Sequence, residues 1–389
     1  METDTALSCT PVESKSGFVL GNVDEVVERI LTFVPTKALF RIASVCRLWR
    51  NCARRVLRMQ QKMTWLSAAG LSRYEEHILL KTMEEGLEEI FLLPQTALLM
   101  VDSDNFSGHC HSYRHKKARK CHPEEESDAV GRLRRLLPSS CDILCVITPG
   151  IVLTPTGLPC GSPKEFMKGE AGFSLLFSSV EGVHIRPFHF CKKSLSKSTL
   201  KEAGLVENPD LKVVLLFGYD AYKHGAAHFL NQLLEPLANS NVLIAGGHVD
   251  RAFPQHRDCC SSGSYGVVGL TLSGARIQGA SVLLDQDVST PEAAEVTISR
   301  LKAVNIPERN TVGFMFACVA RGHNHYNNQH NVEADIFHKI FPSVPLFGFF
   351  GNGEIGCDRV VKEKFTLSQT DANELQHGYT TVMSLVHLG

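Results

Sequence analysis

The sequence predicts an α+β protein in which three short helices precede a long region of mixed strands and helices. Two observations carry this prediction. Apolar residues between positions 23 and 56 recur at helical spacing, whereas from position 63 short apolar runs alternate with helical stretches and Gly- or Pro-marked turns. The second region has about 320 residues, too many for one simple core, so we expect two domains in it.

The composition of the 389-residue chain is that of a globular protein. It is 43% hydrophobic and 21% charged, and the formal net charge of −1 argues against bulk attraction to nucleic acid or membranes. No run reaches the ~18 apolar residues that a membrane span needs, and the polar start lacks the apolar segment of a signal peptide. Thirteen cysteines without regular spacing indicate reduced thiols. We therefore expect a soluble protein of the cytosol or nucleus.

The amino-terminal helices follow from apolar spacing and from one proline. Residues 1–16 are rich in Thr, Ser and Glu, and we expect them to be disordered. An apolar stripe then marks a helix that ends where Pro35 interrupts the backbone ladder. The stripe consists of Val23, Val26, Val27, Ile30, Leu31 and Val34. Thr36 and Ser44 are positioned to cap a second and a third helix.

The third expected helix has an apolar side and a basic side. The apolar side consists of Val45, Leu48, Trp49, Cys52 and Val56, and the basic side of Arg47, Arg50, Arg54 and Arg58. A three-helix unit of this size cannot cover all its apolar side chains, and leaving four or five exposed favours aggregation. We therefore expect a permanent protein partner. The arginines have two interpretations, a solvated face or a contact with an acidic partner.

From position 63 onward the expected strands are short and apolar. They span 64–70, 96–101, 142–155, 172–177, 212–220, 241–250, 265–274, 279–285, 311–322, 344–356 and 378–388, and helices are expected at 224–238, 290–303 and 331–341. Segments 143–152 and 346–356 echo each other, because each runs an apolar strand into a glycine turn, and 244–250 lies between them. Such a duplication favours a pseudo-symmetric pair of domains.

Histidine and cysteine are concentrated in residues 108–122, where soft ligands suggest zinc. The spacings match no familiar zinc finger and the stretch is strongly basic, so we predict neither a metal nor a cofactor. We expect instead a mobile loop over about 105–128. Its basic cluster is a candidate nuclear import signal, made of Arg114, Lys116, Lys117, Arg119 and Lys120.

Two further segments carry candidate binding chemistry. Residues 347–359 are Gly-rich without a phosphate-binding motif, so the glycines are expected to form a tight turn, beside which Glu354 is placed to hold a cationic or amino-bearing ligand. Cys318 ends an apolar strand, and a catalytic thiol there would need a histidine as base. The available bases are His323, His325 and His330. A buried structural cysteine is the simpler interpretation.

Residues 22–60 resemble the F-box family in their amphipathic first helix, their Pro-containing turn and the closing element Val45-Cys46-Arg47-Leu48-Trp49-Arg50. Where many F-boxes begin with Leu-Pro, this chain has Asn22-Val23. The resemblance implies docking on a Skp-family adaptor, which joins the cullin and RING subunits of a Skp–cullin–F-box (SCF) ubiquitin ligase. The implied adaptor-binding residues are Val23, Val27, Ile30, Leu31, Pro35, Val45, Leu48 and Trp49.

The remaining region resembles the FIST family in both its N-terminal and its C-terminal modules. The matching residues are Gly246 and Gly247 with Asp250, "ACVARG" at 317–322 with Glu333, and "GFFGNGEIG" at 348–356. The first-half counterpart lacks the glutamate, because Ile151 follows Gly150 directly. The resemblance implies an F-box over 17–62 and two pseudo-symmetric FIST domains, over 63–250 and 251–389.

These resemblances imply a non-catalytic substrate receptor of an SCF ligase, acting in the nucleus and cytoplasm without direct nucleic-acid or membrane partners. Its FIST domains would bind clients, such as transcription repressors and histone-modifying enzymes, for ubiquitination and degradation. FIST modules are thought to bind small molecules, so the alternative is an amino-acid-like ligand sensor that gates protein interactions. A Cys318 enzyme is a third hypothesis. The candidate client- or ligand-binding residues are Cys318, Arg321, Gly351, Gly353 and Glu354.

Overall fold

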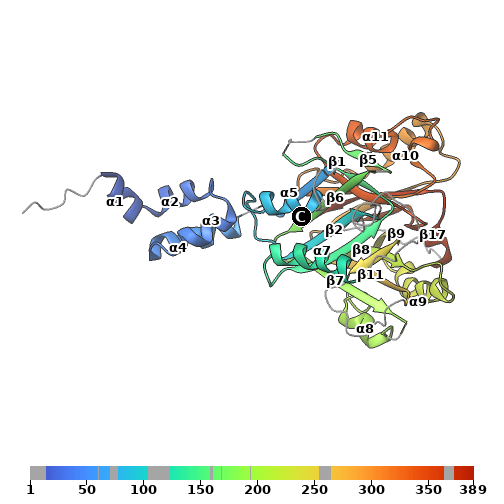
Figure 1. The fold of residues 1–389 in the computed structure, drawn as a ribbon, viewed down its shortest axis with the longest axis horizontal. Helices are drawn as coiled ribbons and strands as arrows, with labels where there is room; N and C mark the ends of the chain where they lie inside the picture. The colour runs from blue at the N-terminus through green and yellow to red at the C-terminus, as the bar shows by residue number, and fades with distance from the viewer. Residues whose placement is uncertain are drawn as a thin grey trace, which may run out of the picture. The chain divides into compact units, whose positions relative to one another are not determined.

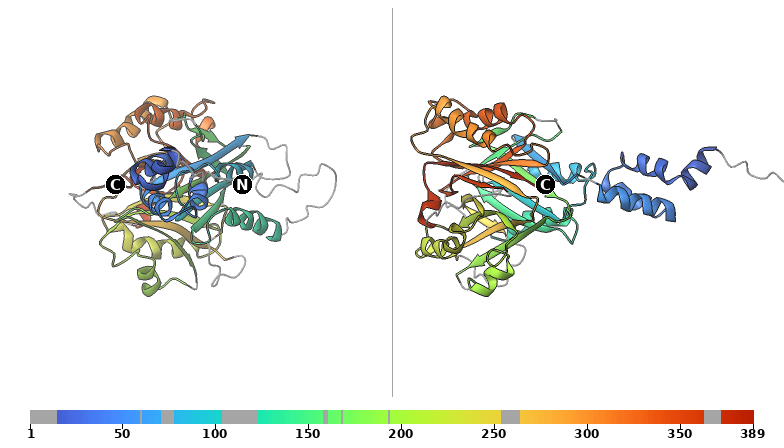
Figure 2. Two further views of the ribbon diagram at one scale, coloured as in Figure 1. Left: turned by 90° about the vertical axis from the view of Figure 1, so that its left-hand side faces the viewer. Right: turned by 180° about the vertical axis from the view of Figure 1, so that it is seen from behind.

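The structure is a computed structural model that describes residues 15–59, 61–70, 78–103, 123–157, 161–167, 169–192, 194–253, 264–362 and 372–389. The chain divides into two units (Figures 1 and 2). The smaller unit comprises Met1–Gln61 with Leu87–Leu93, and the larger comprises Lys62–Gly86 with Pro94–Gly389. The chain therefore passes between the units three times.

Within its described residues, the smaller unit consists of four helices. They are α1 (Lys15–Asn22), α2 (Asp24–Leu31), α3 (Thr36–Ile42) and α4 (Arg47–Arg58). Their core is small and consists of Val27, Leu31, Leu39, Cys52, Ala53 and Val56. The indole Nε1 of Trp49 donates to the carbonyl of Leu20 at 2.8 Å, which fastens α1 to α4.

The boundaries of the first helices differ from the expectation. Lys15 and Ser16, expected to be disordered, lie in α1, while residues 1–14 are outside the described chain. The apolar stripe predicts a helix up to Pro35, but α2 ends at Leu31 and a turn follows. Hydrophobic spacing alone therefore overestimates α2 by three residues, because Val34 continues the pattern without continuing the helix.

The helix caps also differ from the expectation. Pro35 and Cys46, rather than Thr36 and Ser44, are the N-cap residues of α3 and α4. The Cys46 thiol accepts a hydrogen bond from the backbone N–H of Trp49 at 3.5 Å. The Ser44 hydroxyl instead donates to the carbonyl of Arg41 at 2.7 Å, at the end of the preceding helix.

A seven-residue segment from farther along the chain belongs to the smaller unit. Leu87–Leu93 follows α5 (Ile78–Gly86) in sequence but clusters with the four helices. The backbone N–H of Thr36 donates to the carbonyl of Ile90 at 2.9 Å, and Lys37 forms an ion pair with Glu88. The segment therefore braces the start of α3.

Three sheets form the larger unit in the part of the chain that the structure describes. The five-stranded sheet runs β1 (Met63–Gly70), β6 (Glu170–Phe177), β2 (Thr96–Asp102), β3 (Asp142–Thr148), β10 (Arg251–Phe253). The six-stranded sheet runs β17 (Gln376–His377), β15 (Glu354–Gly356), β9 (Leu243–Val249), β8 (Leu211–Tyr219), β11 (Gly266–Ser273), β7 (His184–Cys191). The seven-stranded sheet runs β16 (Arg359–Val361), β12 (Gln278–Leu284), β18 (Thr381–His387), β13 (Thr311–Cys318), β14 (Leu346–Gly351), β4 (Gly150–Leu153), β5 (Lys164–Phe166).

Helices cover the outer faces of these sheets, as Figure 1 shows. Besides α5 they are α7 (Pro123–Leu136), α8 (Lys197–Glu202), α9 (Ala226–Ala238), α10 (Pro291–Ala303) and α11 (Val332–Ile340), with 3-10 turns η1 (Gly322–Asn324) and η2 (Ala372–Leu375). The three helices expected at 224–238, 290–303 and 331–341 are thereby confirmed within two residues at each end.

The larger unit repeats one structural pattern three times. In each sheet a parallel pair, β2/β3, β8/β9 or β13/β14, is flanked on one side by two antiparallel strands, which are β6 and β1, β11 and β7, or β18 and β12. A helix joins the two strands of each parallel pair: α7, α9 or α11. The echo in the sequence is therefore threefold, and 244–250 occupies the same place as 143–152 and 346–356.

A short strand leaves each repeat and completes the sheet of another. β4 pairs with β14, β10 pairs with β3, and β15 pairs with β9, all antiparallel. The three sheets are thus linked in a cycle. The domain limit expected at residue 250 runs between β9 and β10, and these crossovers join strands from both sides of it.

Phenylalanines fill the space where the sheets meet. The ring of Phe217 lies 5.7 Å from Phe316 and 5.8 Å from Phe349, and Phe173 lies 4.9 Å from Phe347, all centroid to centroid. These residues belong to one buried cluster with members from all three sheets. Interlocked in this way, the sheets share a core.

The predicted fold class is confirmed: helices at the amino-terminal end of the chain are followed by mixed α/β sheets. None of the helices in the described ranges has the length and apolar character needed to cross a membrane.

Candidate functional site

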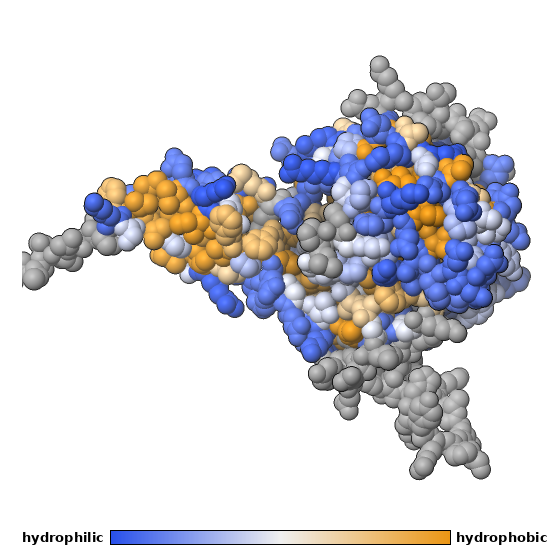
Figure 3. Space-filling model, turned by 90° about the horizontal axis from the view of Figure 1, so that it is seen from above, coloured by the Kyte–Doolittle hydropathy of each residue, from blue (hydrophilic) through white to orange (hydrophobic). Residues whose placement is uncertain are grey.

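The smaller unit leaves an apolar surface uncovered (Figure 3). Eight large apolar side chains among its described residues are between 39% and 71% exposed. We call them the apolar flank; they are Phe18, Val26, Ile30, Phe33, Phe40, Val45, Met59 and Phe91. In the described part of the much larger second unit, only Tyr222, Val296 and Tyr379 are comparably exposed. Exposed apolar surface gathered in this way marks a protein-docking site.

The flank exists because α2 is apolar on two sides. Val27 and Leu31, four residues apart, point into the core of the unit, whereas Val26 and Ile30 are exposed. The face that carries Val27 and Leu31 is enough to build the small core. No described residue of this unit covers the face that carries Val26 and Ile30.

The eight predicted adaptor-binding residues fall into three groups. Val27 and Leu31 are 1% and 0% exposed, so they form the unit's own core and are not free to contact another protein in this conformation. Ile30 and Val45 belong to the apolar flank. The other four are partly buried: Val23, Pro35, Leu48 and Trp49.

Sequence reasoning missed most of the flank. Phe33 and Phe40 stand on either side of Pro35, and two aromatic residues beside a helix-breaking proline were a usable signal. Phe91 gave no such signal, because its place depends on the return of residues 87–93 to the helices. Also missed as docking residues were Phe18, Val26 and Met59.

A pair of ion pairs holds α2 against α4. The Arg55 guanidinium donates from Nε to Glu28 Oε2 at 2.7 Å and from Nη2 to Asp24 Oδ2 at 3.0 Å. One guanidinium thus bridges two carboxylates of α2, and hydrogen bonds between charged groups are stronger than neutral ones. They tie α2 to the last turn of α4.

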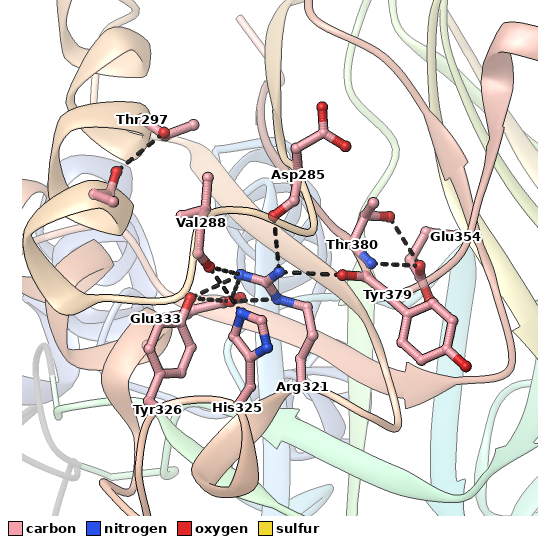
Figure 4. Close-up of polar contacts among 12 residues, drawn as sticks. Asp285, Val288, Thr297, Arg321, His325, Tyr326, Glu333, Glu354, Tyr379 and Thr380 are labelled. Atoms are coloured by element: carbon pink, nitrogen blue, oxygen red, sulfur yellow. Dashed lines mark hydrogen bonds and ion pairs between the residues drawn. The ribbon is translucent and has the colours of Figure 1, made fainter.

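In the larger unit, Arg321 lies at the centre of a buried polar cluster (Figure 4). Its Nε donates to Glu333 Oε1 at 2.9 Å, and its Nη2 donates to the Tyr326 hydroxyl at 2.8 Å. Its remaining N–H groups donate to the backbone carbonyls of Asp285, Val288 and Tyr379 at 3.0–3.2 Å. All five donors of the guanidinium are therefore used.

The cluster balances its own charge away from water. Arg321 and Glu333 are 0% and 1% exposed, and the Tyr326 hydroxyl also donates to Glu333 Oε1, at 2.7 Å. Burial alone would lower the pKa of Arg321, but the adjacent carboxylate of Glu333 raises the pKa above its ordinary value. The sealed guanidinium ties η1 and α11 to two loops, the one after β12 that contains Asp285 and Val288 and the one before β18 that contains Tyr379. It has no donor left for a ligand.

Glu354 is next to this cluster but equally sealed. Its Oε2 accepts from the backbone N–H and the hydroxyl of Thr380 at 3.1 and 2.8 Å, and the carboxylate is 1% exposed. Burial raises its pKa to about 7, and the bonds from Thr380 oppose this shift. Arg321 and Glu354 are linked through two consecutive residues. Arg321 donates to the carbonyl of Tyr379, and Glu354 accepts from the next residue, Thr380.

The two predicted ligand-binding glycines serve close packing. A Cβ at Gly351 would lie 2.4 Å from the carbonyl oxygen of His248, and Gly353 has a φ of +123°. The backbone N–H of His248 donates to the carbonyl of Gly353 at 2.9 Å. Both glycines thus let β14 cross over to β15 beside β9.

Cys318 ends β13 and is 8% exposed. Its backbone N–H donates to the carbonyl of Thr380 at 3.0 Å. Among the described residues no histidine hydrogen-bonds its thiol: His325 Nε2 lies 2.8 Å from the carbonyl of Val288, and His323 stacks on His330. The geometry gives Cys318 no base.

Two other expectations concern the basic loop. The candidate import cluster at 114–120 and the histidine- and cysteine-rich stretch at 108–122 lie outside the described residues. Within the described ranges, no three His, Cys, Asp or Glu side chains gather in a way that would hold a metal ion.

The raised pKa of Glu354 predicts a pH-dependent stability. Because this pKa is about 7 in the folded chain and 4.5 in its ordinary state, the folded chain holds more protons between these values. The contribution of the Glu354 carboxyl group to the free energy of unfolding is therefore fully present below about pH 4.5, and it is lost as the pH rises through 7. We expect Glu354→Gln to raise the urea midpoint at pH 8 more than at pH 5, relative to the unchanged chain. Equal shifts at both pH values would contradict the assignment.

The chain matches two known domain families. Residues 23–60 match the F-box domain family, and residues 269–357 match the FIST C domain family. These matches define the class of F-box proteins with a FIST C domain. Over 389 residues the chain is 49% identical to F-box only protein 22 of Homo sapiens, covering 97% of this chain and 96% of that protein, and the same figures hold for F-box only protein 22 of Pongo abelii. The chain belongs to the F-box only protein 22 family.

Membership of this family gives the apolar flank a meaning. An F-box implies binding to a Skp-family adaptor within an SCF complex, and F-box proteins of this kind imply a substrate-receptor role. The resemblances to the F-box family and to the C-terminal FIST module are confirmed. The exact limits of the domains remain predictions.

Proposed function

We propose that this chain is the substrate-recognition subunit of an SCF ubiquitin ligase, that its apolar flank docks on the adaptor, and that its larger unit binds client proteins for degradation. The single observation that carries the proposal is the apolar flank. Eight exposed apolar side chains on a unit with six core side chains are hard to reconcile with a free existence in water. Each aliphatic or aromatic side chain covered by a partner contributes roughly 1.5–3 kcal/mol.

The chain itself would make and break no bonds. It would raise the concentration of client lysines near a ubiquitin-charged enzyme, which converts a bimolecular encounter into a local one. Clients are expected among nuclear and cytoplasmic proteins, such as transcription repressors and histone-modifying enzymes. The guanidinium of Arg321, whose donors are all used within the chain, supports this role over the alternative of a small-ligand sensor at this residue.

Among the described residues of the larger unit, a groove has the size and polarity to receive client side chains. It has a volume of about 300 Å³ and lies between α8 with its following loop and the strand pair β7–β11. His184, Arg186 and Lys201 line it together with Glu202, Glu207 and Asp210. Both charge signs in one groove favour a peptide over a simple anion.

A comparison of two forms of the full chain in cells tests the proposal. One form is unchanged and the other carries Phe33→Asp in the apolar flank, and proteins captured by each are compared for ubiquitin remnants while the proteasome is inhibited. We expect the same clients on both forms but ubiquitination only with the unchanged chain. Clients that are ubiquitinated equally with both forms would overturn the proposal.

A further inference from the structure

The outward face of α4 carries four arginines that no carboxylate neutralises in the described chain. The side chains are exposed and occupy positions spaced by three, four and four residues, so they share one face opposite the core. We call them the Arg stripe: Arg47, Arg50, Arg54 and Arg58. No ion pair joins any of them to a described acidic residue, whereas the neighbouring Arg55 takes both Asp24 and Glu28.

Helix stability does not account for the first half of the stripe. Arg47 and Arg50 lie in the first turns of α4, whose opening turn has no acidic residue and whose cap is the thiol of Cys46. Positive charge at this end opposes the helix dipole and weakens the helix. Arg54 and Arg58 lie near the carboxyl-terminal end of α4, where positive charge favours the helix dipole. Arg47 and Arg50 weaken their own helix, so the reason for their presence lies outside it.

Positive charge is concentrated on one face of α4. That face carries four arginines, whereas the smaller unit as a whole contains nine Lys or Arg and eight Asp or Glu, and the whole chain has a formal net charge of −1. A basic face on a nearly neutral chain favours a local acidic partner over bulk attraction to a polyanion.

The stripe adjoins two residues of the apolar flank. It begins two residues after Val45 and ends one residue before Met59, and both of these flank residues are well exposed. The Arg50 guanidinium also donates to the carbonyl of Ala43, in the turn that carries Val45, at 3.4 Å. A charged border beside an apolar centre is the usual composition of a protein interface.

We propose that the Arg stripe binds a run of aspartate or glutamate side chains on the protein that covers the apolar flank, and that it accelerates the association of that protein. The inference rests on the proposed function, because it assigns the acidic run to the Skp-family adaptor. Rim charges of this kind act mainly on the association rate and its salt dependence.

The test compares association rates of the full chain with a recombinant Skp-family adaptor at several salt concentrations. We expect Arg50→Gln with Arg54→Gln to lower the association rate constant about tenfold in low salt, and the difference to vanish near 0.5 M salt, where screening acts over only a few ångströms. The double Arg→Lys variant should retain most of the rate. Lys192→Gln with Arg309→Gln removes two exposed charges from the larger unit and should change nothing.

The outcomes separate this inference from the proposed function. An unchanged association rate in the double Gln variant overturns the inference, while the proposed function stands if Phe33→Asp still abolishes binding. An unchanged chain that never binds the adaptor overturns both. Loss of affinity for a short DNA duplex, without any effect on adaptor association, assigns the stripe to nucleic acid and also overturns the inference.

Discussion

Replacing Ile30 and Phe33 together with aspartate should abolish adaptor binding and leave the fold intact. The two side chains are 44% and 71% exposed, so they contribute little to the unit's own core. Covering each of them contributes roughly 1.5–3 kcal/mol, and a buried unpaired carboxylate would oppose docking further. We expect the affinity to fall about 100-fold or more, measured by calorimetry with a purified adaptor.

The matched control lies in the larger unit. Tyr222→Asp with Val296→Asp places two carboxylates at sites that are 85% and 70% exposed. This variant should bind the adaptor like the unchanged chain, and both variants should keep the original melting temperature. Equal affinity of the flank variant and the control would show that the apolar flank is not the docking surface.

Arg321→Met should cause one of the largest losses of stability available to a single substitution in the larger unit. The change leaves Glu333 buried without its counter-charge and removes the three hydrogen bonds that Arg321 donates to backbone carbonyls. Breaking a buried pair on one side costs about 3–5 kcal/mol. Urea unfolding followed by near-ultraviolet circular dichroism measures the effect.

Two further variants give this prediction its controls. Arg300→Met breaks the ion pair with Asp358, whose partners are about half exposed, and should cost less than about 1 kcal/mol. Arg321→Met with Glu333→Leu removes both buried charges, and should be more stable than the sum of the single changes predicts. If Arg321→Met and Arg300→Met unfold at the same urea concentration, the structural role of the cluster is refuted.

The sequence predicts well those elements whose pattern has a single explanation. The helices α9, α10 and α11 emerge from apolar spacing with turn residues on both sides. The edge strand β7 was missed, because His, Arg and Pro187 interrupt its apolar residues. Proline at a sheet edge is tolerated where the N–H is not needed, so this interruption is compatible with a strand.

The docking surface was predicted in kind but only partly in its residues. An apolar stripe shows that α2 has surface to bury, but with both Val26 and Val27 apolar it does not show which side faces α4. That choice depends on the tertiary packing of Val27 and Leu31 against α4, alongside the pairing of Arg55 with Asp24 and Glu28. Long-range pairings of this kind leave no periodic signal.

The pocket predicted around Arg321 and Glu354 illustrates a different limit. The residues were correctly singled out as unusual, because charged groups beside apolar strands need a reason. Sequence alone does not distinguish a charge kept for a ligand from one that is matched internally by Glu333, twelve residues away. The two cases are distinguished only in the structure, by the burial of the charged side chain and by the hydrogen-bond partner of each of its donors.

The threefold repeat shows how partial echoes mislead. Segments 143–152 and 346–356 share an isoleucine after the glycine turn, whereas in 244–250 the glycines are followed by His248 and Val249. Pairing each crossover strand with the sheet of another repeat requires only a short extended segment, not a fixed residue.

Hydrogen–deuterium exchange of the full chain, with and without a Skp-family adaptor, is the most direct test of the claim that a foreign subunit covers the amino-terminal helices. The account predicts strong slowing of amide exchange in peptides from α2, α3 and the turn that carries Val45, with little change in the sheets. Unaltered exchange in those peptides, despite a complex that is demonstrably formed, would contradict it.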